Sequence, residues 1–435
     1  MGRVGPLPNL QRLESLGQRG IRLGLSAIDA VCERLGRPER AVPGVLVAGT
    51  NGKGSTAATL DAIASAAGLR TGLYTSPHLM AVTERIRVGG DDVSPEALDA
   101  ALGGVFAAAD RAPAVPLTYF EAMTAAAFAI FAKEALELAV LEVGLGGRHD
   151  ATNVAPAGLS LVTSIGYDHM ADLGPTLDAI AREKAGVFRR GKPALFWADA
   201  DEARSALAEA ALAAGARLHE ADREIRLGEV GTDLAGTRFH ARTPLREYAL
   251  ATPLPGAHQA RNAALAVRAA ELLAEGEPRI GEEAIRSGVA RVRWPGRLER
   301  FRVGEHTVLL DGCHNAEGAA ALARFLEDAS LRASLIFGVM ADKQVEEIGR
   351  LLLPRVARVW FTAPANERAV PPEELRRRLG GLAPDSTAAS VGAALDAALS
   401  GRAGEPIIVA GSLYLVGEAR GLLLSRGNPD GATRG

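Results

Sequence analysis

A glycine-rich stretch near the N-terminus has the residue types that hold phosphate groups. It reads Gly49-Thr50-Asn51-Gly52-Lys53-Gly54-Ser55 and lies between a short β-branched run and a segment with helical spacing. Glycines let backbone N–H groups face a phosphate, and the first turn of a helix adds positive potential. Lys53 is expected to reach the β- and γ-phosphates of a nucleotide, and the Ser55 hydroxyl to bind Mg²⁺. The stretch therefore predicts a nucleotide phosphate site.

The spacing of this loop differs from the common form G-x-x-x-x-G-K-[ST]. Val47 stands at the position of the first glycine, and Gly54 is inserted between Lys53 and the hydroxyl residue. This spacing speaks against an ordinary GTPase or kinase. The competing interpretation is a glycine-rich turn with an incidental lysine, which the strand before it and the helix after it disfavour.

The elements that position the loop alternate between strand and helix. An apolar run at 45–48 precedes the loop, and helical spacing follows it from Ser55 to Ala67, with Gly68 as the C-terminal cap. Further strands are expected at 138–143 and 159–165 and one beginning at Leu73, with a buried helix over 118–133. This alternation predicts an α/β fold with a phosphate loop on a mostly parallel sheet, and ligands at the carboxyl ends of its strands.

The second half of the chain first departs from this alternation and then resumes it. Residues 217–252 read as a small antiparallel excursion, followed by a helix over 257–274. A rigid Trp294-Pro-Gly-Arg297 element then suggests a domain boundary. Strands are expected at 306–310, 334–339, 356–362 and 406–410. We therefore expect an ATP-binding domain over 1–295, a smaller Rossmann-like α/β domain over 296–425, and a disordered tail over 426–435.

Composition narrows the class of protein. The chain has 435 residues, 48% hydrophobic and 23% charged, with a net charge of -3, which is typical of globular proteins with small partners. Only 4% of residues are aromatic, which argues against a stacking platform for nucleic acid. The two cysteines are too few for a disulfide framework, and no secretory signal or membrane span is apparent. We expect a monomeric cytoplasmic enzyme with no nucleic-acid or membrane partner.

Several motifs follow one another in an order that resembles the folylpolyglutamate synthase and dihydrofolate synthase family, relatives of the Mur peptide ligases. Beyond the phosphate loop, these are Thr75-Ser-Pro-His-Leu79, Leu141-Glu-Val-Gly-Leu-Gly-Gly-Arg148, Asp150-Ala-Thr-Asn153, Asp168-His169, Ile180-Ala-Arg-Glu-Lys-Ala-Gly186, His258-Gln259 with Asn262, Trp294-Pro-Gly-Arg297, Asp311-Gly-Cys-His-Asn315, Gly338-Val-Met-Ala-Asp-Lys343 and Gly411-Ser-Leu-Tyr-Leu-Val-Gly-Glu418. The resemblance covers nearly the whole chain.

The resemblance implies an activity and its cofactors. It implies an ATP-dependent ligase that adds L-glutamate to a folate through an acyl phosphate, and also to dihydropteroate. It further implies two Mg²⁺ ions, a CO₂-derived carbamate on Lys184, and K⁺ as a candidate further cation. Arg22 stands where bifunctional members often carry an acidic residue, so a monofunctional folylpolyglutamate synthase is the alternative.

The metal residues implied by the resemblance are Ser55, Ser76, Glu142 and His169. Three of them have a simpler interpretation from the sequence alone. Glu142 ends an apolar strand, where a carboxylate needs a cation, and that cation is either Mg²⁺ or the side chain of Arg148. His169 could be an ordinary loop histidine, and Ser76 a turn serine before proline.

The resemblance also assigns catalytic and substrate roles. Lys184 would be the carbamylated residue, against the alternative of a surface lysine paired with Asp178, and His314 would lie near the glutamate. The nucleotide contacts beyond the loop would be Asn262, Arg297 and Asp311. The pterin or folate contacts would be Arg22, Leu23, Gly24, Thr118, Phe120, Glu121, Asp150 and Ala151. Because these residues come from both expected domains, we expect a cleft that closes for chemistry.

Two other classes of function compete with this interpretation. A Mur-type cell-wall ligase would have Lys53 followed directly by Ser or Thr, and an N-terminal domain that binds a nucleotide sugar. The phosphate loop of this chain starts at Gly49, which leaves no room for such a domain. A non-catalytic nucleotide switch would need fewer charged groups than Lys184, Glu142 and His169 supply.

Overall fold

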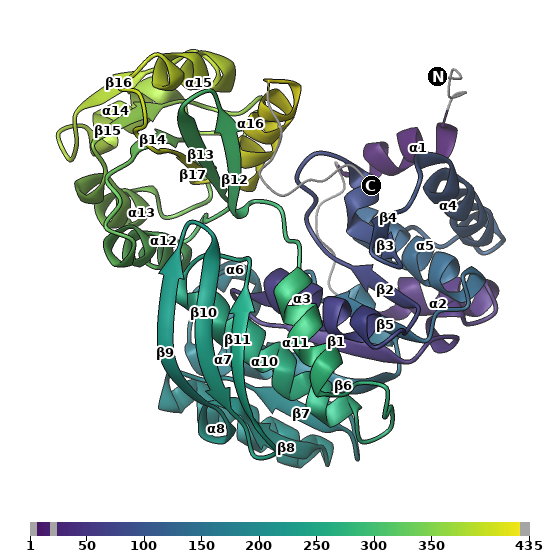
Figure 1. Ribbon diagram of the computed structural model, residues 1–435. Coiled ribbons are helices and arrows are strands. Elements are labelled where there is room, and N and C mark those ends of the chain that lie inside the picture. Colours follow the sequence, from purple (N-terminus) through teal and green to yellow (C-terminus); the bar gives the residue numbers. More distant parts are fainter. Residues whose placement is uncertain (1–6, 18–23, 427–435) are drawn as a thin grey trace. The chain divides into compact units, whose positions relative to one another are not determined.

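The computed structural model describes residues 7–17 and 24–426 (Figure 1). The described chain packs as two compact units. The first contains the described residues up to Leu227, together with Ala241–Tyr248 and Asn262–Val292. The second contains Gly228–His240, Ala249–Arg261 and the described residues from Arg293 onward. The predicted division of the chain at residue 295 stays a prediction, and all but the first residue of the predicted 426–435 tail lies outside the described residues.

An eight-stranded sheet organises the first unit, with the strand order β4-β3-β2-β5-β1-β6-β7-β8. Neighbouring strands from β2 to β8 are parallel, whereas β3 and β4 add an antiparallel edge. Every residue of β1 and β5 is buried, as expected of central parallel strands. The predicted mostly parallel sheet is confirmed. Its strands are β1 Gly44–Ala48, β2 Thr71–Tyr74, β3 Ile86–Val88, β4 Asp91–Asp92, β5 Leu138–Glu142, β6 Ala157–Val162, β7 Pro193–Phe196 and β8 Arg217–Glu220.

Helix α5 (Tyr119–Lys133) confirms the buried helix predicted for the first unit and shows why it starts where it does. The Thr118 hydroxyl oxygen accepts from the backbone N–H of Glu121 at 3.3 Å, and the Glu121 carboxylate accepts from the backbone N–H of Thr118 at 2.8 Å. This reciprocal pair satisfies two N–H groups that a helix start leaves without partners. The other helices of this unit are α1 Pro8–Leu16, α2 Ser26–Arg34, α3 Lys53–Ala66, α4 Pro95–Asp110, α6 Met170–Leu173, α7 Leu177–Lys184, α8 Asp201–Ala214, α9 Ala221–Glu224 and α11 Glu282–Arg291.

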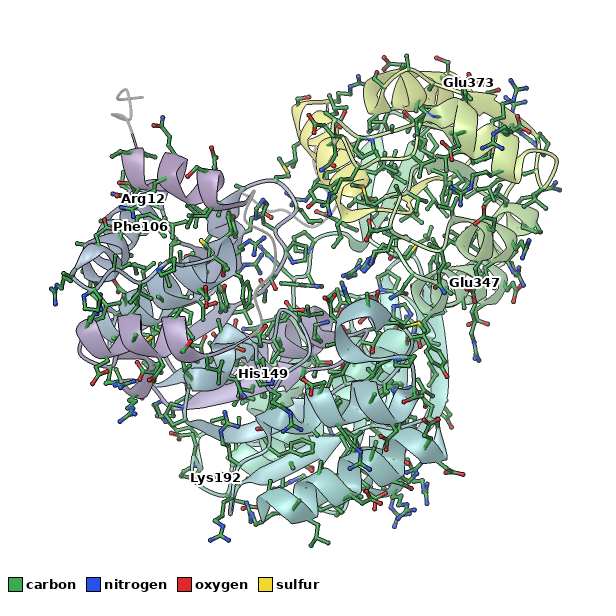
Figure 2. The ribbon with its side chains drawn as sticks, turned by 180° about the vertical axis from the view of Figure 1, so that it is seen from behind. Arg12, Phe106, His149, Lys192, Glu347 and Glu373 are labelled. Carbon is green, nitrogen blue, oxygen red and sulfur yellow. The ribbon has the colours of Figure 1, made fainter. Side chains whose placement is uncertain are left out.

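An arginine of the N-terminal helix α1 contacts two residues of α4. The Arg12 guanidinium lies 4.2 Å from the centre of the Phe106 ring and pairs with the Asp110 carboxylate at 2.7 Å (Figure 2). A cation over an aromatic face adds a modest attraction to the apolar burial beneath it. Leu13 and Leu16 supply that burial from the same helix.

A small three-stranded sheet follows, with the order β11-β10-β9. Its strands are β9 Arg226–Asp233, β10 Gly236–Arg242 and β11 Glu247–Thr252, and α10 (Ala257–Leu273) comes next. The predicted excursion over 217–252 is therefore correct from residue 226 onward. Its first part is wrong, because β8 joins the large sheet parallel to β7.

The second unit contains a six-stranded sheet with the order β12-β13-β17-β14-β15-β16. The strands from β13 to β16 are parallel, and β12 pairs with β13 antiparallel. The predicted smaller α/β domain is confirmed as a fold, with β12 and β16 as strands that the sequence did not predict. The strands are β12 Arg297–Val303, β13 His306–Asp311, β14 Ser334–Phe337, β15 Arg358–Phe361, β16 Asp385–Thr387 and β17 Ile407–Ala410. The helices are α12 Ala316–Asp328, α13 Val345–Leu352, α14 Pro372–Leu379, α15 Val391–Leu399 and α16 Leu413–Arg426.

Among the helices of residues 7–17 and 24–426, none has both the length and the apolar run that crossing a membrane requires.

Candidate active site

The phosphate loop begins at the carboxyl end of β1 and ends in the first turn of α3. Gly49 has a φ of 146° and Gly52 a φ of 82°, values that other residues rarely adopt. A Cβ on Gly49 would lie 2.0 Å from the Thr163 hydroxyl oxygen, and one on Gly52 would lie 2.3 Å from the amide oxygen of Asn262. Both glycines are therefore required by backbone conformation and by close approach. The same contact places the predicted nucleotide residue Asn262 directly against the loop.

The segment that follows β6 holds the loop in place. The Thr163 hydroxyl donates to the carbonyl oxygen of Asn51 at 2.6 Å, and the Asn51 N–H donates to the Ser164 hydroxyl oxygen at 2.9 Å. The Thr50 N–H donates to the Ser164 carbonyl at 2.9 Å. These bonds hold the loop in this conformation without a ligand. The backbone N–H groups in the first turn of α3 are not used by these bonds, and such groups are suited to binding an anion. The sequence analysis assigned no role to Thr163 or Ser164 and placed both inside the strand predicted at 159–165, whereas β6 ends at Val162.

Two lysines meet at one carbonyl oxygen of this loop. Lys53 donates from Nζ to the carbonyl oxygens of Gly49 at 3.1 Å and Thr50 at 3.2 Å. Lys184, at the end of α7 and 5% exposed, donates from Nζ to the same Gly49 carbonyl at 2.9 Å. The structure thus brings two predicted catalytic residues, 131 positions apart in sequence, to a single atom. Neighbouring ammonium groups repel each other, so this arrangement favours an anionic partner.

The alternative interpretation of Lys184 as a surface lysine is wrong. Asp178, its expected partner, instead accepts from Arg182 at 3.0 Å. Burial of Lys184 follows from the short helix α7, which places Ile180, Ala181 and Lys184 on its inner face.

Three of the predicted metal residues lie near the carboxyl ends of β1 and β5: Ser55, Ser76 and Glu142. Glu142 ends β5, is 5% exposed, and is in register with Val47 of β1. Its carboxylate accepts from the Ser76 N–H at 3.1 Å, so these two predicted residues are in direct contact. Ser55 is buried in the first turn of α3. The His169 ring is 44% exposed and lies 3.8 Å from the Asp168 carboxylate.

This donor set fits Mg²⁺ better than a transition metal. Within the part of the chain that the structure describes, no three His, Cys, Asp or Glu side chains gather as a ready-made metal cluster. Mg²⁺ is usually held by one or two carboxylates together with phosphate oxygens and water. Glu142 and the hydroxyls of Ser55 and Ser76 offer oxygen donors of this kind beside the phosphate loop. Arg148 pairs with Glu183 at 3.2 Å, and the alternative that Arg148 neutralises Glu142 stays a prediction.

The glycine-rich loop after Glu142 packs directly on the end of the lysine helix. A Cβ on Gly147 would lie 2.6 Å from the carbonyl oxygen of Lys184. The Arg148 N–H donates to the Glu183 carbonyl at 2.9 Å. The position of the carboxylate of Glu142 is therefore coupled to that of Lys184 through backbone contacts.

Most of the predicted pterin residues are engaged in local structure. Thr118 and Glu121 form the capping box of α5. Phe120 packs against Gly144, where a Cβ would lie 2.6 Å from its ring, and its ring centre is 6.0 Å from that of Tyr74. Gly24 has a φ of 139°. Arg22 and Leu23 lie outside the described residues.

Asp150 organises the turn before β6, and the predicted Ala151 is buried next to it. Its carboxylate accepts from the N–H groups of Leu145 at 2.9 Å and Thr152 at 3.0 Å, and from the Thr152 hydroxyl at 2.6 Å. Burial raises the pKa of this carboxyl, and the donated hydrogen bonds oppose the rise. These contacts show a structural role for Asp150 in shaping the loop that follows Glu142.

The second unit places its predicted nucleotide residues at the joined ends of β12 and β13. Arg297 and Asp311 are paired in register across these strands. The Asp311 carboxylate accepts from the N–H groups of Leu298 at 3.2 Å and Cys313 at 3.0 Å. A Cβ on Gly312 would lie 2.7 Å from an Arg297 guanidinium nitrogen, so the cation lies over that glycine.

Two histidines flank this pair. His314 makes a hydrogen bond from Nδ1 to the Gly312 carbonyl at 2.9 Å, which requires a proton on Nδ1. Burial lowers the pKa of His258; Asp311 opposes this fall, and the Arg297 cation adds to it. The sequence analysis quoted His258 within a motif but gave it no role. Its four-residue spacing before Asn262 on one helix face was the available signal.

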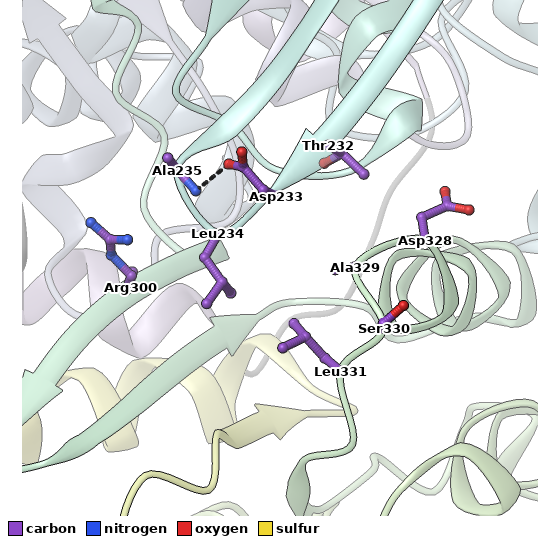
Figure 3. A pocket seen from close by; sticks show the side chains of 9 residues that line it. All are labelled: Thr232, Asp233, Leu234, Ala235, Arg300, Asp328, Ala329, Ser330 and Leu331. Carbon is purple, nitrogen blue, oxygen red and sulfur yellow. Dashed lines mark hydrogen bonds between the residues drawn. The ribbon is translucent and has the colours of Figure 1, made fainter.

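A hollow in the second unit lies away from the predicted site residues. It has a volume of about 490 Å³ and is lined by the β9–β10 turn, by Arg300 of β12 and by the end of α12 (Figure 3). None of the predicted site residues lines it. The Asp233 carboxylate there accepts from the Ala235 N–H at 2.7 Å, which closes the turn.

Comparison with known families agrees with this geometry. The Mur ligase middle domain matches residues 47–270, and the Mur ligase glutamate ligase domain matches residues 296–413. The first match includes the phosphate loop after β1, and the second includes Arg297 and Asp311 of β12 and β13.

Individual relatives are similar to this chain over most of their length. The dihydrofolate synthase/folylpolyglutamate synthase of Bacillus subtilis is 39% identical over 341 residues, 76% of this chain and 78% of the relative. Escherichia coli FolC in complex with DHPP and ADP has a TM-score of 0.85 at 33% identity, covering 97% of this chain and 99% of that chain. The bifunctional enzyme of Yersinia pestis complexed with AMPPNP and Mn ion has a TM-score of 0.84 at 32% identity, covering 97% and 98%. The chain therefore belongs to the folylpolyglutamate synthase/dihydrofolate synthase family of Mur ligases, and it is an ATP-dependent ligase that adds glutamate to folates.

Proposed function

We propose that the chain adds L-glutamate both to tetrahydrofolates and to dihydropteroate, through an acyl phosphate formed at the phosphate loop. The observation that carries this proposal is the meeting of Lys53 and Lys184 at the Gly49 carbonyl oxygen. The Bacillus subtilis relative carries both activities in its name, and E. coli FolC binds DHPP and ADP, which supports the wider substrate range.

The reaction has two bond-making steps. A substrate carboxylate oxygen attacks the γ-phosphorus of ATP, and the bond from that phosphorus to the β,γ-bridging oxygen breaks as ADP leaves. The glutamate amine then attacks the acyl carbon, forms the amide C–N bond, loses a proton and expels phosphate. Lys53 is proposed to neutralise the γ-phosphate in the first step, in concert with the N–H groups that open α3.

Lys184 is proposed to carry a carbamate. Two ammonium groups on one carbonyl oxygen repel each other, and conversion of the Lys184 amine to an anion replaces that repulsion by attraction to Lys53. The carbamate would also offer oxygen atoms near the carboxylate of Glu142, since the loop after Glu142 packs on the end of α7.

Ser55, Ser76, Glu142 and His169 are proposed to hold Mg²⁺, of which the reaction is expected to use two ions. The metal neutralises phosphate charge when bound. The Mn ion and AMPPNP in the Yersinia pestis relative support a divalent ion with a nucleotide in such a site. Glu142 is oriented for this role by the Ser76 N–H. K⁺ remains a candidate further cation.

Asn262, Arg297 and Asp311 are proposed to bind the nucleotide, and His314 to lie near the glutamate substrate. For the folate side we propose Phe120 as the stacking surface, because it is half-buried beside Gly144. Thr118, Glu121, Asp150 and Ala151 are proposed to shape the loops around it. We further propose that the protein works as a cytoplasmic monomer.

Ligation of labelled glutamate, run separately with dihydropteroate and with a tetrahydrofolate, tests the substrate range. Product is expected with both, and turnover with only one would establish a monofunctional enzyme. Absence of ATP-dependent product with either would overturn the whole proposal.

The carbamate has its own test in Lys184→Ala. The variant is expected to lose activity by about 100-fold or more, and short-chain carboxylic acids are expected to restore part of it, because an added carboxylate can occupy the place of the carbamate. The exposed Lys192 on the approach to β7 supplies the matched control (Figure 2), and Lys192→Ala should keep wild-type activity. Full activity of Lys184→Ala without added acid would exclude the role.

A further inference from the structure

Arg189 makes an unusual set of contacts for an arginine. It follows the single turn Ala185–Val187 that continues α7 beyond Lys184. Its Nη1 donates to the Val187 carbonyl at 3.0 Å and more weakly, at 3.4 Å each, to the carbonyls of Gly186 and Phe188. Its Nη2 donates to the backbone carbonyl of Asn153 at 2.8 Å and to its side-chain oxygen at 2.6 Å. One side chain thus gathers the turn after Lys184 and the turn Ala151–Val154.

Asn153 also donates hydrogen bonds to both segments. Its amide nitrogen donates to the Arg148 carbonyl at 3.0 Å and to the Gly186 carbonyl at 3.2 Å. Gly186 therefore accepts from both Arg189 and Asn153. Together the two side chains join the segment that follows Glu142 in the chain to the segment that follows Lys184.

The contacts of Arg189 carry no charge pairing. Every oxygen to which it donates belongs to a backbone carbonyl or to the Asn153 amide. Burial lowers the pKa of this guanidinium, and among the described residues no carboxylate pairs with it. A partly buried cation without a counter-ion is costly, and its planar donors are suited to holding several oxygens at fixed positions. The arrangement is therefore suited to fixing geometry and supplies no ion-pair stability.

The segments that this pair fixes have little freedom to shift independently. A Cβ on Gly186 would lie 2.4 Å from the Cα of Arg148, and one on Gly147 would lie 2.6 Å from the Lys184 carbonyl. The Ser160 hydroxyl of β6 also donates to the Val187 carbonyl at 2.6 Å. A shift of the segments that Arg189 holds would therefore be passed on to the end of α7, and with it to the position of the Lys184 amine relative to Glu142.

We propose that Arg189, together with Asn153, is a positioning residue for the ligase reaction that sets the placement of Lys184 against the Glu142 loop. It touches no substrate and acts through these two residues. The inference rests on the proposed role of Lys184, and it predicts that a perturbed Arg189 lowers both the rate of turnover and the affinity of Lys184 for CO₂.

The test compares Arg189→Met and Arg189→Lys with Arg190→Met, in which the exposed neighbouring arginine is changed. We expect Arg189→Met to lower kcat by about 10- to 100-fold, since small misplacements at reacting groups have effects of this size. The KM for ATP should stay within about twofold, because the phosphate loop does not contact Arg189. Arg189→Lys should recover part of kcat, and Arg190→Met should match the wild type.

The bicarbonate dependence of activity separates positioning from general loss of structure. Wild type and Arg189→Met are assayed in CO₂-depleted buffer with bicarbonate added back, and their melting temperatures are measured alongside. Arg189→Met should need a several-fold higher bicarbonate concentration for half-maximal activity. Equal bicarbonate requirement in the two folded proteins would overturn the inference. A wild type that ignores bicarbonate would instead count against the carbamate itself.

A double-mutant cycle with Asn153→Ala keeps the inference testable if Arg189→Met folds poorly. Asn153→Ala removes the shared amide but leaves the contacts of Arg189 with the turn after Lys184. If both residues act through one connection, the double variant should lose little more kcat than the worse single variant. Losses that multiply independently would show that the two residues do not act together.

Discussion

The two units present their functional residues at the same kind of place, the carboxyl ends of parallel strands, but prepare them differently. In the first unit, β1 opens into a glycine turn whose Gly49 carbonyl accepts from both Lys53 and Lys184. In the second unit, the end of β13 carries Asp311, whose carboxylate already accepts from two backbone N–H groups beside Arg297. The first place gathers cationic groups, and the second balances a cation against an anion.

From this difference we infer separate functions for the two strand ends. A concentration of positive charge is most useful where negative charge develops during phosphoryl transfer. A balanced pair with fixed geometry is suited to holding an uncharged ribose or base. Changes in the first unit should therefore mainly lower kcat, whereas changes in the second unit should mainly raise the KM for ATP.

The largest effect is expected from Lys53→Met. Removal of this ammonium takes away the charge that is proposed to face the transferring phosphate, and we expect kcat to fall by about 1,000-fold. Lys133→Met, at the exposed end of α5, should leave kcat unchanged. Single-turnover formation of phosphate is the direct measurement. A fall confined to the KM for ATP would contradict the assignment of chemistry to the first unit.

A smaller effect on a different parameter is expected from Arg297→Gln. The guanidinium lies over Gly312 beside Asp311, and its loss should raise the KM for ATP by about 10-fold, as expected for one charge-assisted hydrogen bond. The kcat should change less than about threefold. Arg302→Gln, on the exposed face of the same strand, is the control. A large fall in kcat with an unchanged KM would contradict the inference that changes in the second unit mainly affect the KM for ATP.

Sequence patterns predicted the architecture of both units because their signals are local. The apolar runs of β1, β5, β13 and β17 are short, buried and flanked by glycine-rich turns, so length and composition identified them. β12 and β16 were not predicted, because both are edge strands of mixed polarity and contain no continuous apolar run. Strand β8 was assigned to the wrong sheet because its parallel pairing with β7 is set by the tertiary fold.

The candidate site was predictable in its residue types but not in its contacts. The spacing of the phosphate loop predicts that Lys53 faces phosphate, yet nothing local shows that Lys184 reaches the same carbonyl oxygen. That contact depends on the packing of α7 on the loop after Glu142. The support from Thr163 and Ser164, and the connection through Arg189, likewise arise from residues more than 30 positions from their partners, so single-sequence periodicity carries no trace of them.

The smallest expected effect is on the pH dependence of stability, and it concerns His258 in the second unit. Burial and Arg297 lower the pKa of His258 below its ordinary value near 6.5, with Asp311 opposing. Below about pH 6.5 the unfolded chain therefore gains a proton that the folded chain resists, so stability present above that pH is lost as the pH falls through it. His258→Gln removes this contribution.

We therefore expect His258→Gln to be less sensitive to acid than the wild type. Between pH 8 and pH 5 its free energy of unfolding should fall by about 1 kcal/mol less than that of the wild type, measured by urea titration at both pH values. His240→Gln, at a histidine with a side chain 47% exposed, should keep the wild-type difference. Both charges near His258 belong to Arg297 and Asp311, the pair proposed to bind the nucleotide. An identical pH dependence in the two proteins would mean that these two charges do not hold His258 as a neutral imidazole. The second unit would then lack the prearranged charge balance that distinguishes it from the first.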